Sequence, residues 1–244
     1  RWANDGDVNS LDPYARNETF LLAFLQNIYE PLARRNKELQ LEPALAEKWG
    51  QVSPTRWFFD LRRDVKFHDG SSFNADDVVF SINRANGKGS NMQTYFSTMK
   101  EIVKVNDYRV EVETNVPDPL LASKWAQIFI MSKTWAEKNK AMEVSDLTKN
   151  EENFATRNAN GSGPFVVKTR EPDVKTVLVR NEAWWDKKVE HNLGTVEFSR
   201  VANAATRVAA LRAGQIDMMY TVPPQDTETL AKDENTKVIE GPET

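Results

Sequence analysis

The side chains of this sequence that could do chemistry gather in one short segment, residues 65–84. It reads VKFHDGSSFNADDVVFSINR and holds His68, one of only two histidines in 244 residues, followed by Asp69 and Ser71. Histidine, carboxylate and hydroxyl groups together can form a nucleophilic triad, and a histidine with carboxylates can bind a metal ion. The segment is therefore a catalytic site, a metal site or a piece of scaffold.

The spacing of these residues argues against both kinds of site. The members of a triad converge from different parts of a fold, whereas side chains as close in sequence as His68, Asp69 and Ser71 diverge. The second histidine, His191, has no companion at the spacing of metal ligands. Neither GxxxxGK[ST] nor GxGxxG, the motifs that hold nucleotide phosphates, occurs. We expect no catalytic residue, no metal ligand and no cofactor, and two partly exposed histidines.

The same polar residues have a structural explanation. The dipeptide Asp-Gly at 69–70 favours a turn. Asn74 suits a helix N-cap, and Asp77 stands three residues later in the capping-box position. The apolar residues that follow, Val78, Val79 and Ile82, fall on one helical face. The segment is interpreted as scaffold, a turn followed by a helix.

Composition excludes several classes of function. Lysine and arginine number 32 against 36 acidic residues, a net charge of −4, so we expect neither nucleic acid nor an anionic membrane as a partner. The absence of cysteine excludes disulfides, thiol nucleophiles and thiolate zinc sites. No apolar run approaches the ~20 residues of a transmembrane helix, and the first ten residues lack the regions of a signal peptide. If the protein is exported, its signal has already been removed.

Apolar periodicity predicts several elements in the first 142 residues. Residues 19–35 have the helical spacing of an amphipathic helix. Apolar alternation at 57–61 that resumes at 65–67 predicts a hairpin, and the Asn-Asp turn within 103–112 predicts a second one. Two further helices are predicted at 118–130 and 134–142.

The remaining third of the chain has a different pattern. Residues 143–160 are polar and lack periodicity, so we place a domain crossing there. Asn203 suits a helix N-cap, and Gly214 suits the left-handed position that ends a helix. We therefore predict a strand, a helix and a second strand parallel to the first, from the stretches TVEFSRV, NAATRVAALRAG and QIDMMYT. The strands FVVK and KTVLVR precede this unit, and a helix near Pro223 and a short strand at 236–240 follow it.

Several stretches, in this order, resemble one family. The resemblance is to the solute-binding proteins of peptide, dipeptide and nickel type that feed ABC importers, and it covers nearly the whole chain. The most specific block is the long one that contains the segment at 65–84. The stretches are LDPY, IYEPL, PALAEKWG, WFFDLRRDVKFHDGSSFNADDVVFSINR, NGSGPF, RNEAWW and AALRAGQIDMM.

The resemblance implies an α/β fold of the periplasmic-binding-protein type II, with two lobes joined by a hinge and an extra subdomain inserted into the first lobe. Relatives are much longer, so we expect an incomplete fold in which the second lobe is absent. Residues 1–42 and 161–244 are expected to form the discontinuous core of lobe I. Residues 43–160 are expected to form the inserted α+β subdomain.

Tryptophan supplies one candidate for ligand binding from the residues themselves. Seven tryptophans are many for this length, and aromatic side chains can serve as stacking platforms. Most are expected in the core. Trp125 lies on a less apolar segment, so we predict it as a pocket aromatic, with core packing as the alternative.

The resemblance implies further ligand contacts, matched one position at a time. Thr19 falls where relatives offer a polar contact from the first lobe, and Tyr95 matches a subdomain tyrosine that reaches the ligand backbone in peptide binders. Tyr220, Thr221 and Val222 fall where the first lobe meets the hinge and cleft. The structural alternatives are a helix N-cap for Thr19, packing for Tyr95 and strand termination for the last three. We predict that Thr19, Tyr95 and Tyr220 border a common cleft.

Three classes of function remain open at this stage. The leading hypothesis is a monomeric, non-enzymatic binding protein at the periplasmic or extracellular face of a bacterial membrane, which captures an oligopeptide, dipeptide or similar solute and delivers it to an ABC permease. The second is a receptor that presents its ligand to a signalling partner. The third is a hydrolase, for which the sequence lacks a credible nucleophile and base.

Overall fold

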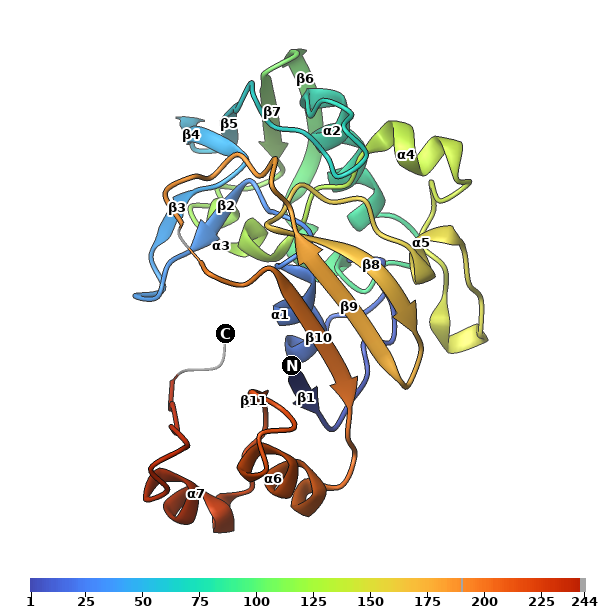
Figure 1. Ribbon diagram of the computed structural model, residues 1–244. Coiled ribbons are helices and arrows are strands. Elements are labelled where there is room, and N and C mark those ends of the chain that lie inside the picture. The colour runs from blue at the N-terminus through green and yellow to red at the C-terminus, as the bar shows by residue number, and fades with distance from the viewer. Residues whose placement is uncertain (190, 242–244) are drawn as a thin grey trace. The chain divides into compact units, whose positions relative to one another are not determined.

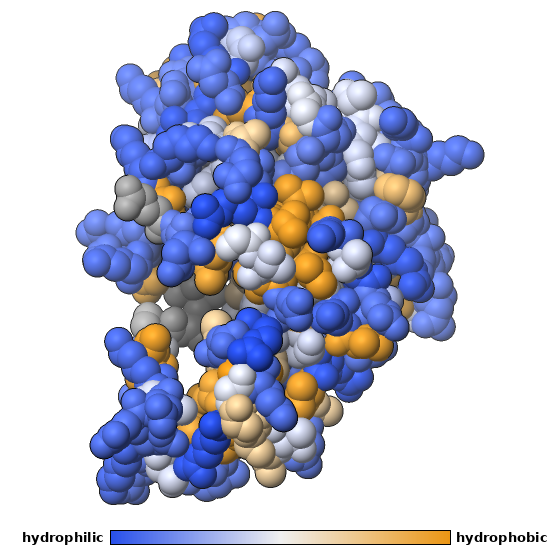
Figure 2. All heavy atoms as spheres, viewed as in Figure 1, coloured by the Kyte–Doolittle hydropathy of each residue, from blue (hydrophilic) through white to orange (hydrophobic). Residues whose placement is uncertain are grey.

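The computed structural model describes residues 1–189 and 191–241, and its contacts divide the chain into two units (Figure 1). The five-stranded unit consists of Arg1–Asn9, Val167–Arg180 and His191–Thr244. The four-stranded unit consists of Ser10–Val166 and Asn181–Glu190. Hydrophilic side chains cover most of the visible surface, and apolar side chains show only in patches (Figure 2).

The five-stranded unit is named for its mixed sheet, in the order β11-β1-β10-β9-β8. The short strand β1 pairs in parallel with both of its neighbours, β11 and β10, whereas β9 and β10 are antiparallel. The strands are β1 (Trp2–Asn4), β8 (Phe165–Glu171), β9 (Lys175–Arg180), β10 (Thr195–Arg200) and β11 (Met218–Met219).

The predicted strand, helix and strand near the end of the chain are confirmed. Helix α6 (Ala204–Arg212) joins β10 to β11, and β1 lies between these two strands. The Asn203 side chain accepts a hydrogen bond from the Thr206 N–H at 2.9 Å, and Gly214 has a φ of 65°. Both positions therefore have the capping geometry that their residue types favour.

Helix α7 (Pro224–Ala231) begins with a proline, as expected from a residue that fits the first helical position. The strand predicted at 236–240 is wrong, because no strand forms there. Val238 packs instead against a small apolar cluster of Val208, Met219 and Leu230. The apolar side chain of Val238 therefore contributes to this cluster and not to a sheet.

The four-stranded unit contains an antiparallel sheet in the order β4-β5-β7-β6. The hairpin predicted at 103–112 is confirmed by the pairing of β6 with β7. The hairpin predicted at 57–67 is wrong: β5 pairs with β4, while Val65 and Phe67 are buried outside any strand. Strand β4 was not predicted because most of its residues are exposed and its sequence lacks apolar alternation. The strands are β4 (Ala46–Ser53), β5 (Arg56–Leu61), β6 (Met99–Asn106) and β7 (Arg109–Thr114).

Helix α2 (Ala75–Ala85) has the predicted capping box and contacts β6 and β7. The Asn74 side chain accepts from the Asp76 N–H at 2.7 Å, and the Asp77 carboxylate accepts from the Asn74 N–H at 2.9 Å. The interpretation of this stretch as a helix start is therefore confirmed.

The other predicted helices are shorter than their patterns suggested. Residues 118–130 form only α3 (Leu121–Lys124) and the 3-10 turn η2 (Trp125–Gln127). The segment then becomes extended, because Phe129 bridges to Pro31 and the Ile130 N–H donates to the Glu30 carbonyl at 2.9 Å. The remaining helices of this unit are α1 (Thr19–Leu25), η1 (Gln93–Phe96), α4 (Lys133–Lys138), η3 (Leu147–Lys149) and α5 (Phe154–Arg157). The strands β2 (Ala33–Arg35) and β3 (Leu41–Pro43) form a separate pair.

The division of the chain differs from the expected boundaries at 42 and 161. Residues 10–42 group with the four-stranded unit, and so do residues 181–190. One reason is visible at Tyr14, whose hydroxyl donates to the buried Phe129 carbonyl at 2.5 Å. Strands β5 and β10 lie in separate sheets, as the two-part organisation requires. The finer statement, that 43–160 is an insertion into a lobe, stays a prediction.

Candidate functional site

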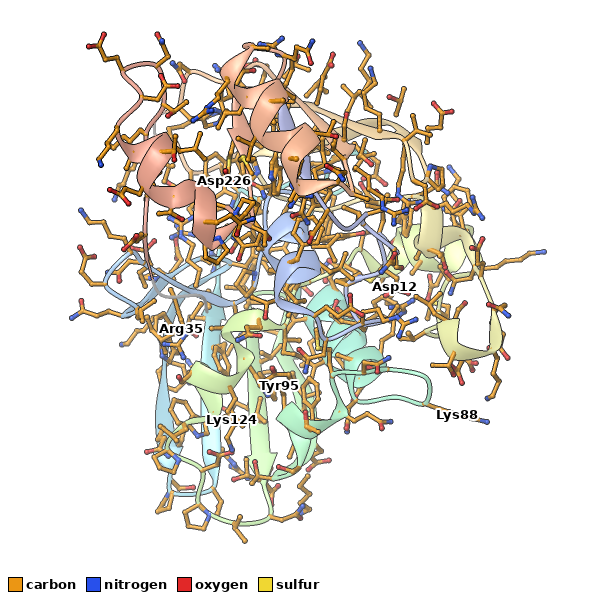
Figure 3. The ribbon with its side chains drawn as sticks, turned by 90° about the horizontal axis from the view of Figure 1, so that it is seen from below. Asp12, Arg35, Lys88, Tyr95, Lys124 and Asp226 are labelled. Carbon is orange, nitrogen blue, oxygen red and sulfur yellow. The ribbon has the colours of Figure 1, made fainter. Side chains whose placement is uncertain are left out.

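Tyr95 lies on η1 of the four-stranded unit and is half-buried (Figure 3). Its hydroxyl lies 3.4 Å from the Gln127 side-chain oxygen and 3.5 Å from the Asn17 side-chain oxygen. These long contacts hold the phenol weakly. A tyrosine hydroxyl beside two amide side chains offers the donors and acceptors that a peptide backbone needs.

Thr19 is exposed and is the first residue of α1. Its alternative role as an N-cap is wrong, because Glu18 occupies the N-cap position and makes no side-chain capping bond. Thr19 follows Asn17 by two residues, and Asn17 faces the Tyr95 hydroxyl. The structure therefore brings the start of α1 close to η1.

Trp125 is a core residue in this structure. Its side chain is 2% exposed, and its ring stacks on Phe59 with the centroids 6.1 Å apart and packs against Phe96 at 5.4 Å. The indole N–H donates to the Tyr95 carbonyl at 3.3 Å. Burial thus favours the packing alternative, and a direct ligand contact from Trp125 stays an untested prediction.

The other predicted ligand residues, 220–222, belong to the five-stranded unit. The Tyr220 N–H donates to the Ala3 carbonyl at 3.1 Å, and Val222 packs against the cluster that contains Val208. Thr221 is exposed and has a φ of 62°. Left-handed backbone costs a non-glycine residue roughly 1–2 kcal/mol, so strain is stored here. The common cleft with Thr19 and Tyr95 stays a prediction.

The predicted scaffold role of the segment around His68 has a clear geometry. The His68 N–H donates to the Gly161 carbonyl at 2.8 Å, and the Asp69 N–H donates to the Asn160 side chain at 3.0 Å. The His68 imidazole lies 3.1 Å from the Gly163 carbonyl, and burial lowers its pKa. His68 thus contacts the NGSGP turn through both its backbone N–H and its imidazole. Among the described residues no group of three or more His, Cys, Asp or Glu could hold a metal ion.

The glycines of this turn are required by close backbone contact. A Cβ added at Gly161 would lie 1.9 Å from the Ile28 carbonyl oxygen, and one at Gly163 would lie 2.9 Å from it. The Gly163 N–H donates to that same oxygen at 2.9 Å. The turn therefore packs directly against the backbone of Ile28, three residues after the end of α1.

Sequence reasoning missed the buried carboxylate of Glu30, which is 3% exposed. It accepts hydrogen bonds from the Ser162 hydroxyl at 2.7 Å, the Trp184 indole at 3.1 Å and the Trp185 indole at 2.9 Å. Burial raises the pKa of Glu30, and these three donors oppose the rise. The signal was present, because IYEPL, NGSGPF and RNEAWW each contribute one part of this cluster.

Comparison with known proteins identifies the family of this chain. Residues 40–244 match the model of the bacterial extracellular solute-binding proteins, family 5. The chain belongs to this family. The suspected family is therefore confirmed. In the described part of the chain, no helix is long and apolar enough to cross a bilayer.

Individual relatives agree with this assignment. The chain is 25% identical to the glutathione-binding protein GsiB of Salmonella choleraesuis, over 97% of the chain and 44% of the relative. It is 28% identical to the oligopeptide-binding protein AppA of Bacillus subtilis, over 91% of the chain and 39% of the relative. The chain thus spans less than half the length of these family 5 relatives.

A solved structure confirms the fold class. The periplasmic binding protein DppA of Helicobacter pylori, in complex with the peptide STSA, superposes with a TM-score of 0.83 and 25% identity, covering 96% of this chain and 48% of that protein. The α/β fold of this family 5 chain is therefore that of part of a periplasmic binding protein.

Proposed function

We propose that this chain is part of the substrate-binding component of an ABC importer, and that the complete protein captures a short peptide. The protein would work outside the cytoplasmic membrane, as a monomer, and deliver its ligand to the membrane permease. Its action would be closure of two lobes over the ligand, with no covalent chemistry.

The observation that carries this proposal is the family match over residues 40–244. The choice of a peptide is supported by the relatives named for glutathione and oligopeptides, and by the neighbour solved with STSA. The partly exposed polar group formed by Tyr95, Asn17 and Gln127 supplies hydrogen-bonding partners that a peptide backbone can use.

The test is native mass spectrometry of the full-length protein purified from its source, followed by titration with a mixture of di- to pentapeptides. A bound mass that matches a peptide, and a Kd in the micromolar range or below, is the expected result. A bound heme, metal chelate or sugar acid would overturn the peptide assignment. New peptide fragments after incubation would instead support a hydrolase.

A further inference from the structure

The five-stranded unit buries an arginine that has no carboxylate partner among the residues that the structure describes. Arg207 of α6 is 2% exposed, and the ion pairs described for this unit use other residues. Its position as the fourth residue of the helix is also unfavourable, because the nearby positive end of the helix dipole repels a cation. A charge buried in such a place must be held by other contacts.

Those contacts are backbone carbonyls from two separate segments. One guanidinium nitrogen, Nη1, donates to the Val201 oxygen at 2.7 Å and to the Ala202 oxygen at 3.0 Å, just after β10. The other, Nη2, donates to the Thr221 oxygen at 3.5 Å, two residues after β11. Arg207 therefore links the carboxyl ends of two parallel strands.

The carbonyl held from β11 belongs to the strained residue. Thr221 is β-branched and has a φ of 62°, a conformation that such residues rarely adopt. Its neighbours are anchored on both sides, because the Tyr220 N–H donates to Ala3 and the Pro223 carbonyl accepts from the Asp226 N–H at 2.9 Å. The strained residue thus sits between two fixed points, with its oxygen directed at Arg207.

The fork of the guanidinium explains why arginine stands here. Its planar N–H groups can reach carbonyls in two directions at once, whereas the single ammonium group of lysine cannot span both segments with the same geometry. The Arg207 Nε has no hydrogen-bond partner among the described residues. The side chain is thus oriented by the two strand ends rather than by use of all its donors.

We propose that Arg207 is a positioning residue for the ligand site. Through its contact with the Thr221 carbonyl it orients the backbone of residues 220–222, which are predicted to bind the ligand, and it does not itself touch the ligand. This inference rests on the proposed function and on the prediction that residues 220–222 contribute to ligand binding.

Hydrogen exchange on the 244-residue chain tests the structural part. In Arg207→Lys, the backbone amides of 220–222 should exchange at least ten-fold faster than in the wild type, while those of β4 and β5 keep their rates. The matched control is Arg212→Lys on the same helix, where the exposed arginine lies 3.8 Å from Asp233. Equal exchange at 220–222 in Arg207→Lys and the wild type would overturn the proposal.

A second substitution separates positioning from general stabilisation. Asparagine tolerates left-handed backbone better than threonine does. Thr221→Asn in the Arg207→Lys background should therefore recover at least a three-fold slowing of exchange at 220–222, whereas a merely structural role predicts no recovery. If Arg207→Lys does not fold, Arg207→Gln is measured in its place, and exchange at 220–222 equal to that of the wild type would contradict the proposal.

Ligand affinity completes the test in the full-length protein, at a temperature where circular dichroism shows each variant folded. Arg207→Lys should bind the peptide mixture at least five-fold more weakly, and Arg212→Lys should bind as the wild type does. Unchanged affinity in Arg207→Lys would reject the positioning role. If the wild type binds no peptide, the proposed function fails, while the exchange experiment still decides the role of the Arg207 contacts.

Discussion

The indole N–H of Trp185 donates to the buried carboxylate of Glu30 at 2.9 Å, across 155 residues of sequence. The same ring stacks on the guanidinium of Arg62, 3.9 Å from its centroid. This stacking contact links Arg62, which directly follows β5, to the segment at 181–190. Three stretches that are far apart in the sequence are thus fixed to one another by a single acceptor group and one aromatic ring.

Replacing Glu30 by glutamine should destabilise the chain by about 2 kcal/mol, because an amide offers one acceptor oxygen and turns a donor toward the indoles. Urea unfolding at pH 7 measures this change. The control is Glu47→Gln, an exposed partner of Arg62 at 3.4 Å, which should cost less than about 0.5 kcal/mol. Equal losses in the two variants would show that the buried cluster adds no stability.

Stability should also depend on pH through Asp77, whose pKa burial raises to about 6. The folded state then holds the proton more tightly than the unfolded state does, so this contribution is present below pH 4 and is lost as pH rises through 6. Relative to Asp77→Asn, the free energy of unfolding of the wild type should fall by about 3 kcal/mol across that window.

The control for this titration is Asn74→Ala, which removes the cap of the same helix without removing an ionisable group. It should cost about 1 kcal/mol at every pH from 4 to 7. Thermal or urea unfolding at four pH values provides the comparison. A constant difference between the wild type and Asp77→Asn would contradict the raised pKa.

Local patterns predicted the elements whose signals lie within a few residues. The capping box at Asn74 and Asp77, the N-cap at Asn203 and the left-handed Gly214 follow from residue type alone, and the structure has all of them. The hairpin at 103–112 also follows from its turn. These features depend on neighbours in sequence, so one sequence is enough to find them.

Features that depend on distant contacts could not be predicted in this way. The helical pattern at 118–130 failed because Ile130 hydrogen-bonds to Glu30, a hundred residues earlier. The Glu30 cluster was not predicted, although its three segments were noted, because the sequence does not show that the donors of two segments meet the carboxylate of a third. The family resemblance supplied the candidates Thr19 and Tyr95, and their roles in binding stay predictions.

Removing the Tyr95 hydroxyl should weaken peptide binding by the full-length protein about five- to ten-fold, since a neutral hydrogen bond contributes about 1 kcal/mol. Tyr95→Phe keeps the ring, and isothermal titration measures the loss. The control is Tyr108→Phe, a half-buried tyrosine of the same unit whose ring lies 4.6 Å from the Arg63 guanidinium. Unchanged affinity in Tyr95→Phe would remove Tyr95 from the site.

The 244-residue chain by itself should bind the solute weakly or not at all. A two-lobe binder gains affinity by surrounding its ligand, because closure is favoured only when the ligand contacts both lobes. If the complete protein bound at about 1 μM, roughly −8 kcal/mol, an even split between lobes would leave about −4 kcal/mol, a Kd near 1 mM. Isothermal titration of this chain beside the full-length protein measures the difference. Equal micromolar affinity in both would place the whole site within these residues and would reject closure of two lobes as the mechanism.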